Sequence, residues 1–264
     1  MRTHLIHIRK TGGRTIINSI LNSLVGSEGK VPMETVLRKN ISDVDFRNTD
    51  SKIICANELG VDNIKNIYGE LTSNLYESVP EKIKGKYLCL HCEDVHIEDD
   101  KFFSASHSLH HKLFFKDNTL GVTVLRDPLE RVMSQYRMIL GMKKLGLITS
   151  GLDDTSYVQS LDYFIDNYPP EHLSEQLHSF SSKLNPDEAI KNVRGLGLVM
   201  FNHDLEGGVK KLSGLMGIDI QVKTIGVGVI KDSGLTKEQQ NKLRDKLKDE
   251  YTFYNELLSE FYGV

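Results

Sequence analysis

Short apolar runs alternate along the chain with longer stretches in which the apolar residues recur at helical spacing. Residues 5–8 carry Leu5, Ile6 and Ile8, a brief β-branched run typical of a buried strand. Residues 14–24 are predicted to form an amphipathic helix, since their apolar side chains fall on one side: Ile16, Ile17, Ile20, Leu21 and Leu24. Between these segments, residues 9–13 break both patterns with two adjacent glycines. The first 24 residues therefore predict a strand, a tight loop and a helix.

The rest of the chain continues this alternation. Further strands are predicted at residues 52–56, 86–90, 101–104, 120–125 and 196–201, whereas residues 57–85 are ambiguous between helix and loop. A helix is predicted at residues 204–216. Three others are predicted to begin at capping residues, Asp127, Asn185 and Thr236, and Glu188 and Gln239 complete capping-box patterns at the last two. The last of them is expected to run unbroken over residues 236–261. Strands alternating with helices predict an α/β fold in one domain, residues 1–264, with a mostly parallel central sheet flanked by helices.

Composition narrows the function classes. Hydrophobic residues make up 39% and charged residues 26% of the chain, as in soluble globular proteins. The net charge of −3 argues against a nucleic-acid partner. No apolar run approaches the ~20 residues that span a bilayer, and the chain enters its first strand without room for a signal peptide. Three cysteines cannot form a disulfide framework, so we expect a cytoplasmic protein.

The loop after the first strand has the chemistry of an anion site. Gly12 and Gly13 let the backbone approach a ligand closely, and the helix that follows directs its free amides and positive dipole toward the loop. Lys10 and Arg14 add full positive charges. The segment is not a Walker A loop, because the lysine precedes the glycines. The alternative is an ordinary strand-to-helix turn with solvated cations.

A second strand-turn-helix segment occupies residues 122–136. Arg126 stands where the strand ends, which in open α/β sheets is the ligand-binding edge. Ser134 follows about two helical turns later. A guanidinium and a hydroxyl can share one phosphate. By itself the segment is equally consistent with a capped helix that carries surface arginines.

Together the two segments resemble a known family. His7-Ile-Arg-Lys-Thr-Gly-Gly13 is similar to the phosphosulfate-binding loop of the sulfotransferases related to heparan sulfate 2-O- and 6-O-sulfotransferases. Residues 125–136 resemble the 3′-phosphate motif of that family, with Arg and Ser eight residues apart. Weaker similarity over residues 196–217 and the final helix extends the resemblance to most of the chain. One departure is Arg9, which stands where the family usually has proline.

The resemblance implies a P-loop-like three-layer fold and the donor PAPS (3′-phosphoadenosine 5′-phosphosulfate), with PAP (3′,5′-ADP) as product and no metal. It assigns Lys10 to the 5′-phosphate and to the oxygen that bridges to sulfur, and Arg126 with Ser134 to the 3′-phosphate. The whole set expected to bind the donor is Arg9, Lys10, Thr11, Gly12, Gly13, Arg14, Thr15, Arg126 and Ser134.

Sulfuryl transfer also needs a base for the acceptor hydroxyl. A sulfuryl group carries less negative charge than a phosphoryl group, so a fixed lysine can neutralise the leaving phosphate where kinases need a metal ion. Histidine is the usual base near neutral pH. His107 follows a predicted strand in a segment that resembles the family's Gly-His segment, so we assign the base to it. His110, His111 and Glu58 are the alternatives.

Metal and redox chemistry are disfavoured. Cys89 and Cys92 have the spacing of zinc and redox motifs but lack a second cysteine pair, and no glutamate completes a zinc motif with His107 and His111. The acidic run at residues 93–100 favours neutral or cationic acceptors if it borders the acceptor site. Residues 226–234 are a candidate covering loop for the adenine.

The sequence thus predicts an enzyme, a PAPS-dependent sulfotransferase that acts on an acceptor hydroxyl, with a saccharide as the expected partner. Two alternatives remain: a P-loop-type nucleotide-dependent kinase, and a non-catalytic module that binds PAP or another nucleotide. The acceptor and the oligomeric state are left open.

Overall fold

The computed structural model describes residues 2–25, 89–91, 103–106, 119–144, 146, 153–222 and 234–263. Several predicted segments lie outside these ranges: the strand at 52–56, the ambiguous segment 57–85, the acidic run 93–100 and all but the last residue of the loop 226–234. No helix in the described ranges has both the length and the apolar character to cross a membrane.

The described strands form one five-stranded sheet in the order β2-β3-β1-β4-β5. Every pairing is parallel, which confirms the predicted parallel sheet. Ile6, at the end of β1, lies opposite Ser106 of β3 and Thr123 of β4, so the segments after these strands leave from the same edge. The strands are β1 (Arg2–Ile6), β2 (Cys89–His91), β3 (Phe103–Ser106), β4 (Thr119–Leu125) and β5 (Leu198–Phe201).

Helices cover both faces of this sheet. Successive strand residues point to opposite sides, so each strand contributes apolar side chains to both faces. Leu5 belongs to a core shared with α1 (Gly13–Val25) and α10 (Leu205–Met216). Ile6 belongs to the core of the other face, which is closed by three helices: α8 (Glu175–Phe180), α9 (Pro186–Arg194) and α12 (Lys248–Tyr262). The fold is therefore α/β with helices on both sides of a parallel sheet.

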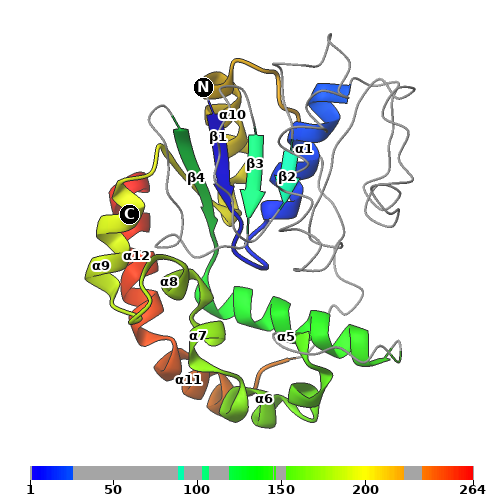
Figure 1. Ribbon diagram of the computed structural model, residues 1–264. Helices are drawn as coiled ribbons and strands as arrows, with labels where there is room; N and C mark the ends of the chain where they lie inside the picture. Colours follow the sequence, from blue (N-terminus) through cyan, green and yellow to red (C-terminus); the bar gives the residue numbers. More distant parts are fainter. Residues whose placement is uncertain are drawn as a thin grey trace.

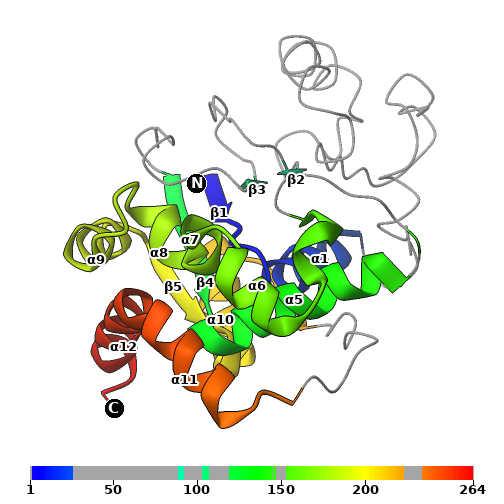
Figure 2. The same cartoon turned by 90° about the horizontal axis from the view of Figure 1, so that it is seen from below.

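A third core lies beyond the carboxyl ends of β1 and β4, where α5 (Pro128–Lys144) crosses under the sheet (Figure 1). Seen from below, α5 lies beside α6 and α11 (Figure 2). Besides α5, this core is built by η6 (Thr155–Val158), α6 (Leu161–Asn167), α7 (Pro170–Leu173) and α11 (Lys237–Lys246). The sequence did not predict η6, α6, α7 or α8.

Most predicted helix starts are confirmed. Asp127 accepts a hydrogen bond from the Glu130 amide over 3.0 Å, and the pair Thr236 and Gln239 forms a reciprocal capping box with two bonds of 3.1 Å. The capping box expected at Asn185 has only its first bond, since the Glu188 carboxylate accepts from Ser181.

The first predicted strand was displaced. It was expected at residues 5–8, but β1 spans Arg2–Ile6. Ile8 is buried, yet it lies past Ile6, the last residue of β1 that pairs with both β3 and β4. The apolar run at residues 5–8 therefore identified residues that are buried, but not the residues that pair with neighbouring strands.

The predicted final helix is wrong as a single element, because α11 ends at Lys246 and α12 begins at Lys248. Leu247 between them has φ −97° and ψ 8°, outside the helical range. Leu243 and Leu247 pack in the core around α5, whereas Tyr254 and Leu257 pack against the sheet. One apolar stripe thus serves two cores, and the chain turns between them.

Candidate functional site

The loop between β1 and α1 is held in an unusual conformation by contacts with the rest of the fold. Lys10 has φ 65° and Gly12 has φ 113°, both in the left-handed half of the backbone map. Inside the loop, the Thr11 hydroxyl donates to the Ile8 carbonyl over 2.9 Å. From η7 (Asn202–Asp204), the Asn202 amide donates to the Thr11 carbonyl over 2.7 Å. These bonds fix the direction of the backbone where the sequence predicted an anion site.

Both glycines of the loop are required by their neighbours. A Cβ atom on Gly12 would lie 2.8 Å from Nδ2 of Asn202, and one on Gly13 would lie 2.1 Å from the ring of His7. Helix α1 begins at Gly13, and the Thr15 amide donates to the Gly12 carbonyl over 2.9 Å. The amides ahead of Thr15 have no acceptor within the helix and carry the positive end of its dipole. The first turn of α1 contains no acidic residue to neutralise it.

Arg126 meets this loop although 116 residues separate it from Lys10. Its Nη1 donates to the Lys10 carbonyl over 3.3 Å, and its Nε donates to the Glu130 carboxylate over 3.2 Å. The side chain keeps an exposed fraction of 24%. The two predicted anion motifs therefore meet at one edge of the sheet.

Lys10 is partly buried and lies near two other cations, Arg14 and Arg126. Burial lowers the pKa of Lys10 below its ordinary value of 10.5, and the charges of Arg14 and Arg126 lower it further. Asp153 acts in the opposite direction. A negatively charged ligand at this site would relieve the repulsion among the three cations.

Arg9 contacts protein carboxylates. Its guanidinium lies 3.2 Å from Asp153 and 3.9 Å from Glu175. Asp153 also accepts a hydrogen bond from Gln135 of α5 over 3.0 Å. These contacts attach the start of the loop to α8 and to the segment before η6.

Ser134 lies in the second turn of α5 and is half-buried. The predicted bases His107, His110, His111 and Glu58 lie outside the described residues. The residue before His107 is Ser106, which ends β3 opposite Ile6, at the edge where the Lys10 loop leaves the sheet.

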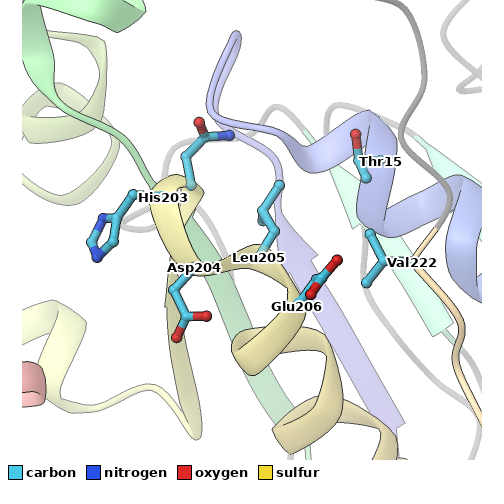
Figure 3. A pocket seen from close by; sticks show the side chains of 7 residues that line it. Thr15, His203, Asp204, Leu205, Glu206 and Val222 are labelled. Atoms are coloured by element: carbon cyan, nitrogen blue, oxygen red, sulfur yellow. The ribbon is translucent and has the colours of Figure 1, made fainter.

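A pocket of about 300 Å³ opens on the β5 side of the loop (Figure 3). Thr15 of α1 and Val222 form one side, and Leu205 with Glu206 at the start of α10 form the other. Asn202, His203 and Asp204 complete the lining. The sequence did not predict this pocket, nor the role of Asp204 as the cap of α10, in which its carboxylate accepts from the Gly207 amide over 3.1 Å.

Sequence reasoning also missed the residues that hold the anion motifs in place, Asn202 behind the loop and Gln176 behind Arg126. Neither lies near its partner in the sequence, so no local pattern could have identified it. Among the described residues, no three His, Cys, Asp or Glu side chains are grouped so that they could hold a metal ion. No protein-family model matches the chain, and no curated protein matches it.

Proposed function

We propose that the protein is a PAPS-dependent sulfotransferase that transfers a sulfuryl group to a carbohydrate hydroxyl. One observation carries the proposal: Arg126 donates to the Lys10 carbonyl over 3.3 Å, so the motifs that resemble the 5′- and 3′-phosphate sites of the family are adjacent. A nucleotide with phosphates on both ribose positions is the ligand class that such a pair suits. A central parallel strand that leads through a glycine loop into a helix also supports a P-loop-like fold.

In this proposal the loop from Thr11 to Thr15 binds the 5′-phosphate, and Arg126 with Ser134 binds the 3′-phosphate. The acceptor oxygen bonds to sulfur as the bond from sulfur to the bridging oxygen breaks, with the two oxygens in line. Lys10 neutralises the charge that develops on the departing phosphate, and His107 takes the proton of the acceptor. The products are a sulfate ester and 3′,5′-ADP.

We assign the adenine to the pocket beside Thr15. The pocket shares this residue with the anion loop, so one nucleotide can occupy both. Asp204 and Glu206 line it, and carboxylates accept hydrogen bonds from an exocyclic amine while repelling phosphate. For Arg9 we propose a role in holding the loop, because its guanidinium is already paired with Asp153 and Glu175.

Ligand-induced thermal stabilisation tests the donor assignment. We expect 3′,5′-ADP to raise the melting temperature and ATP with Mg²⁺ to leave it unchanged, since a ligand stabilises only a state that binds it. The reverse result would favour the kinase alternative. Transfer of radiolabelled sulfate from PAPS to neutral glycans, polyanionic glycans and phenols then tests the reaction. Binding of 3′,5′-ADP without transfer to any acceptor would instead favour a non-catalytic module.

A further inference from the structure

Gln176 of α8 grips the backbone of Arg126 on both sides. Its Oε1 accepts from the Arg126 amide over 2.7 Å, and its Nε2 donates to the Arg126 carbonyl over 2.9 Å. Arg126 follows Leu125, the last residue of β4 to pair with β5. The Gln176 amide therefore supplies the two hydrogen bonds that a neighbouring strand would have made.

The orientation of the Gln176 amide is itself fixed. Its Nε2 also donates to Oε1 of Glu250 in α12 over 2.8 Å. A backbone N–H only donates and a carbonyl only accepts, so the oxygen must face the Arg126 amide and the nitrogen must face the Arg126 carbonyl and the Glu250 carboxyl group. Gln176 and Glu250 are both fully buried, and no solvent competes for these bonds.

A buried arginine balances the charge of Glu250. Arg131 of α5 has an exposed fraction of 0%, and its Nε lies 3.6 Å from the Glu250 carboxylate. The same guanidinium lies 3.2 Å from Glu175, which is 3.9 Å from Arg9. Side chains in contact, buried except for the half-buried Glu175 and Arg9, thus run continuously from the backbone of Arg126 to the start of the loop that carries Lys10.

We propose that Gln176 is a positioning residue for the 3′-phosphate contact: by holding the Arg126 peptide groups, it sets where the guanidinium meets the nucleotide. The inference rests on the proposed function, in which Arg126 binds the 3′-phosphate of the donor. Gln176 is fully buried and touches no ligand itself. Its effect must therefore pass through Arg126 and be selective for ligands that carry a 3′-phosphate.

The test compares the binding of 3′,5′-ADP and of 5′-AMP by calorimetry. Gln176→Met removes both hydrogen bonds at similar side-chain volume. We expect it to weaken 3′,5′-ADP binding about tenfold or more while leaving 5′-AMP binding within about twofold. In an Arg126→Ala background the same substitution should cause no further loss, because coupled residues are non-additive. Asn192→Leu is the matched control, since it removes a 2.7 Å bond to the Phe180 carbonyl at the other end of α8.

Each result has one meaning. Unchanged 3′,5′-ADP affinity in a folded Gln176→Met protein, equal losses for both nucleotides, or additive losses with Arg126→Ala would overturn the positioning role. If Gln176→Met does not fold, Gln176→Asn replaces it; its amide is one methylene too short to reach both groups, and the same selective loss is expected. A wild-type protein that binds neither nucleotide would overturn the proposed function itself.

Discussion

Lys10 is the residue on which the proposed chemistry depends, and its backbone is strained. A φ of 65° in a residue other than glycine costs on the order of 1–3 kcal/mol and persists only where the surroundings enforce it. Here the Arg126 guanidinium holds the Lys10 carbonyl, and Asn202 holds the next one, at Thr11. Contacts that maintain a strained backbone at Lys10 also fix the direction of its side chain, as the proposed contact with the departing phosphate requires.

Lys10→Ala is expected to lower the rate of sulfuryl transfer by at least about 100-fold, because the charge on the departing phosphate loses its neutralising cation. The fold should remain intact, since the substitution leaves the Lys10 carbonyl in place to accept from Arg126. Single-turnover kinetics with PAPS measures the rate, and a thermal melt checks the fold. Lys210→Ala, on the exposed surface of α10, is the control. Near-normal turnover of Lys10→Ala would refute the leaving-group role.

Gly13 and Gly214 form a matched pair of helical glycines. An added Cβ on Gly13 would lie 2.1 Å from the His7 ring, whereas one on Gly214 would meet nothing within 4 Å. We expect Gly13→Ala to lower the free energy of unfolding by about 1–3 kcal/mol and Gly214→Ala to raise it by about 0.5–1 kcal/mol. Urea denaturation measures both. Equal effects would mean that the loop accommodates a side chain and that the close approach of His7 is not a constraint.

At the scale of elements, the loop between β1 and α1 obtains its rigidity from neighbouring elements. The sulfotransferase family that the two motifs resemble usually has proline where this chain has Arg9, and proline stiffens a loop through its fixed φ. Arg9 instead pairs with Asp153 and Glu175, which belong to other parts of the fold. These ion pairs and the hydrogen bond from η7 hold the loop through contacts with distant parts of the fold, where a proline would have stiffened the loop locally.

Removing the attachment to η7 should therefore loosen the loop. Asn202→Ala leaves the Thr11 carbonyl without its 2.7 Å bond, and Thr11 is fully buried. We expect a loss of about 1–3 kcal/mol in the free energy of unfolding and weaker binding of 3′,5′-ADP. Asn167→Ala removes a comparable 2.9 Å bond on the exposed surface of α6 and should change stability by less than about 0.5 kcal/mol. Unaltered nucleotide affinity in Asn202→Ala would show that η7 does not organise the loop.

Local sequence patterns predicted the elements best where one residue decides the geometry. The starts of α5 and α11 followed from Asp127 and from the Thr236–Gln239 pair, because a cap is a local interaction. The break at Leu247 could not be predicted in this way. Its stripe of apolar residues is continuous, and only the positions of two separate cores divide it.

The residues of the candidate site also differ in whether a local sequence pattern could predict them. The loop at Lys10 and the strand end at Arg126 were predicted because glycines, cations and strand ends are visible in the sequence. Gln176 and Asn202 were not, since they act on residues 50 and 191 positions away. A glutamine on a short helix has no local signature of such a role.

At the scale of the whole molecule, charged side chains join two of the three cores, the one around α5 and the one that α8 and α12 close over the sheet. Arg131 of α5 lies between Glu175 of α8 and Glu250 of α12, at 3.2 Å and 3.6 Å. Burial raises the pKa of both carboxyl groups above 4.5, and Arg131 opposes that rise. This arrangement ties the helix below the sheet to two helices on its face, at the point where Arg126 leaves β4.

Arg131→Met should cost about 3–5 kcal/mol of unfolding free energy, because it leaves the buried Glu250 carboxylate without a balancing charge and leaves Glu175 with Arg9 alone at 3.9 Å. The loss should depend on pH. A carboxyl whose folded-state pKa is raised loses stability as pH rises from its unfolded value of 4.5 through its folded value, and without Arg131 the folded value is higher still. The variant should therefore lie further below the wild type in melting temperature at pH 8 than at pH 5.

The control is Arg194→Met, which removes a surface arginine that pairs with Glu256 and Glu260 and should show no such trend. A gap between wild type and Arg131→Met that stays constant from pH 5 to pH 8 would mean that neither carboxyl changes its protonation over this range through the loss of Arg131, and that the guanidinium does not control their pKa values.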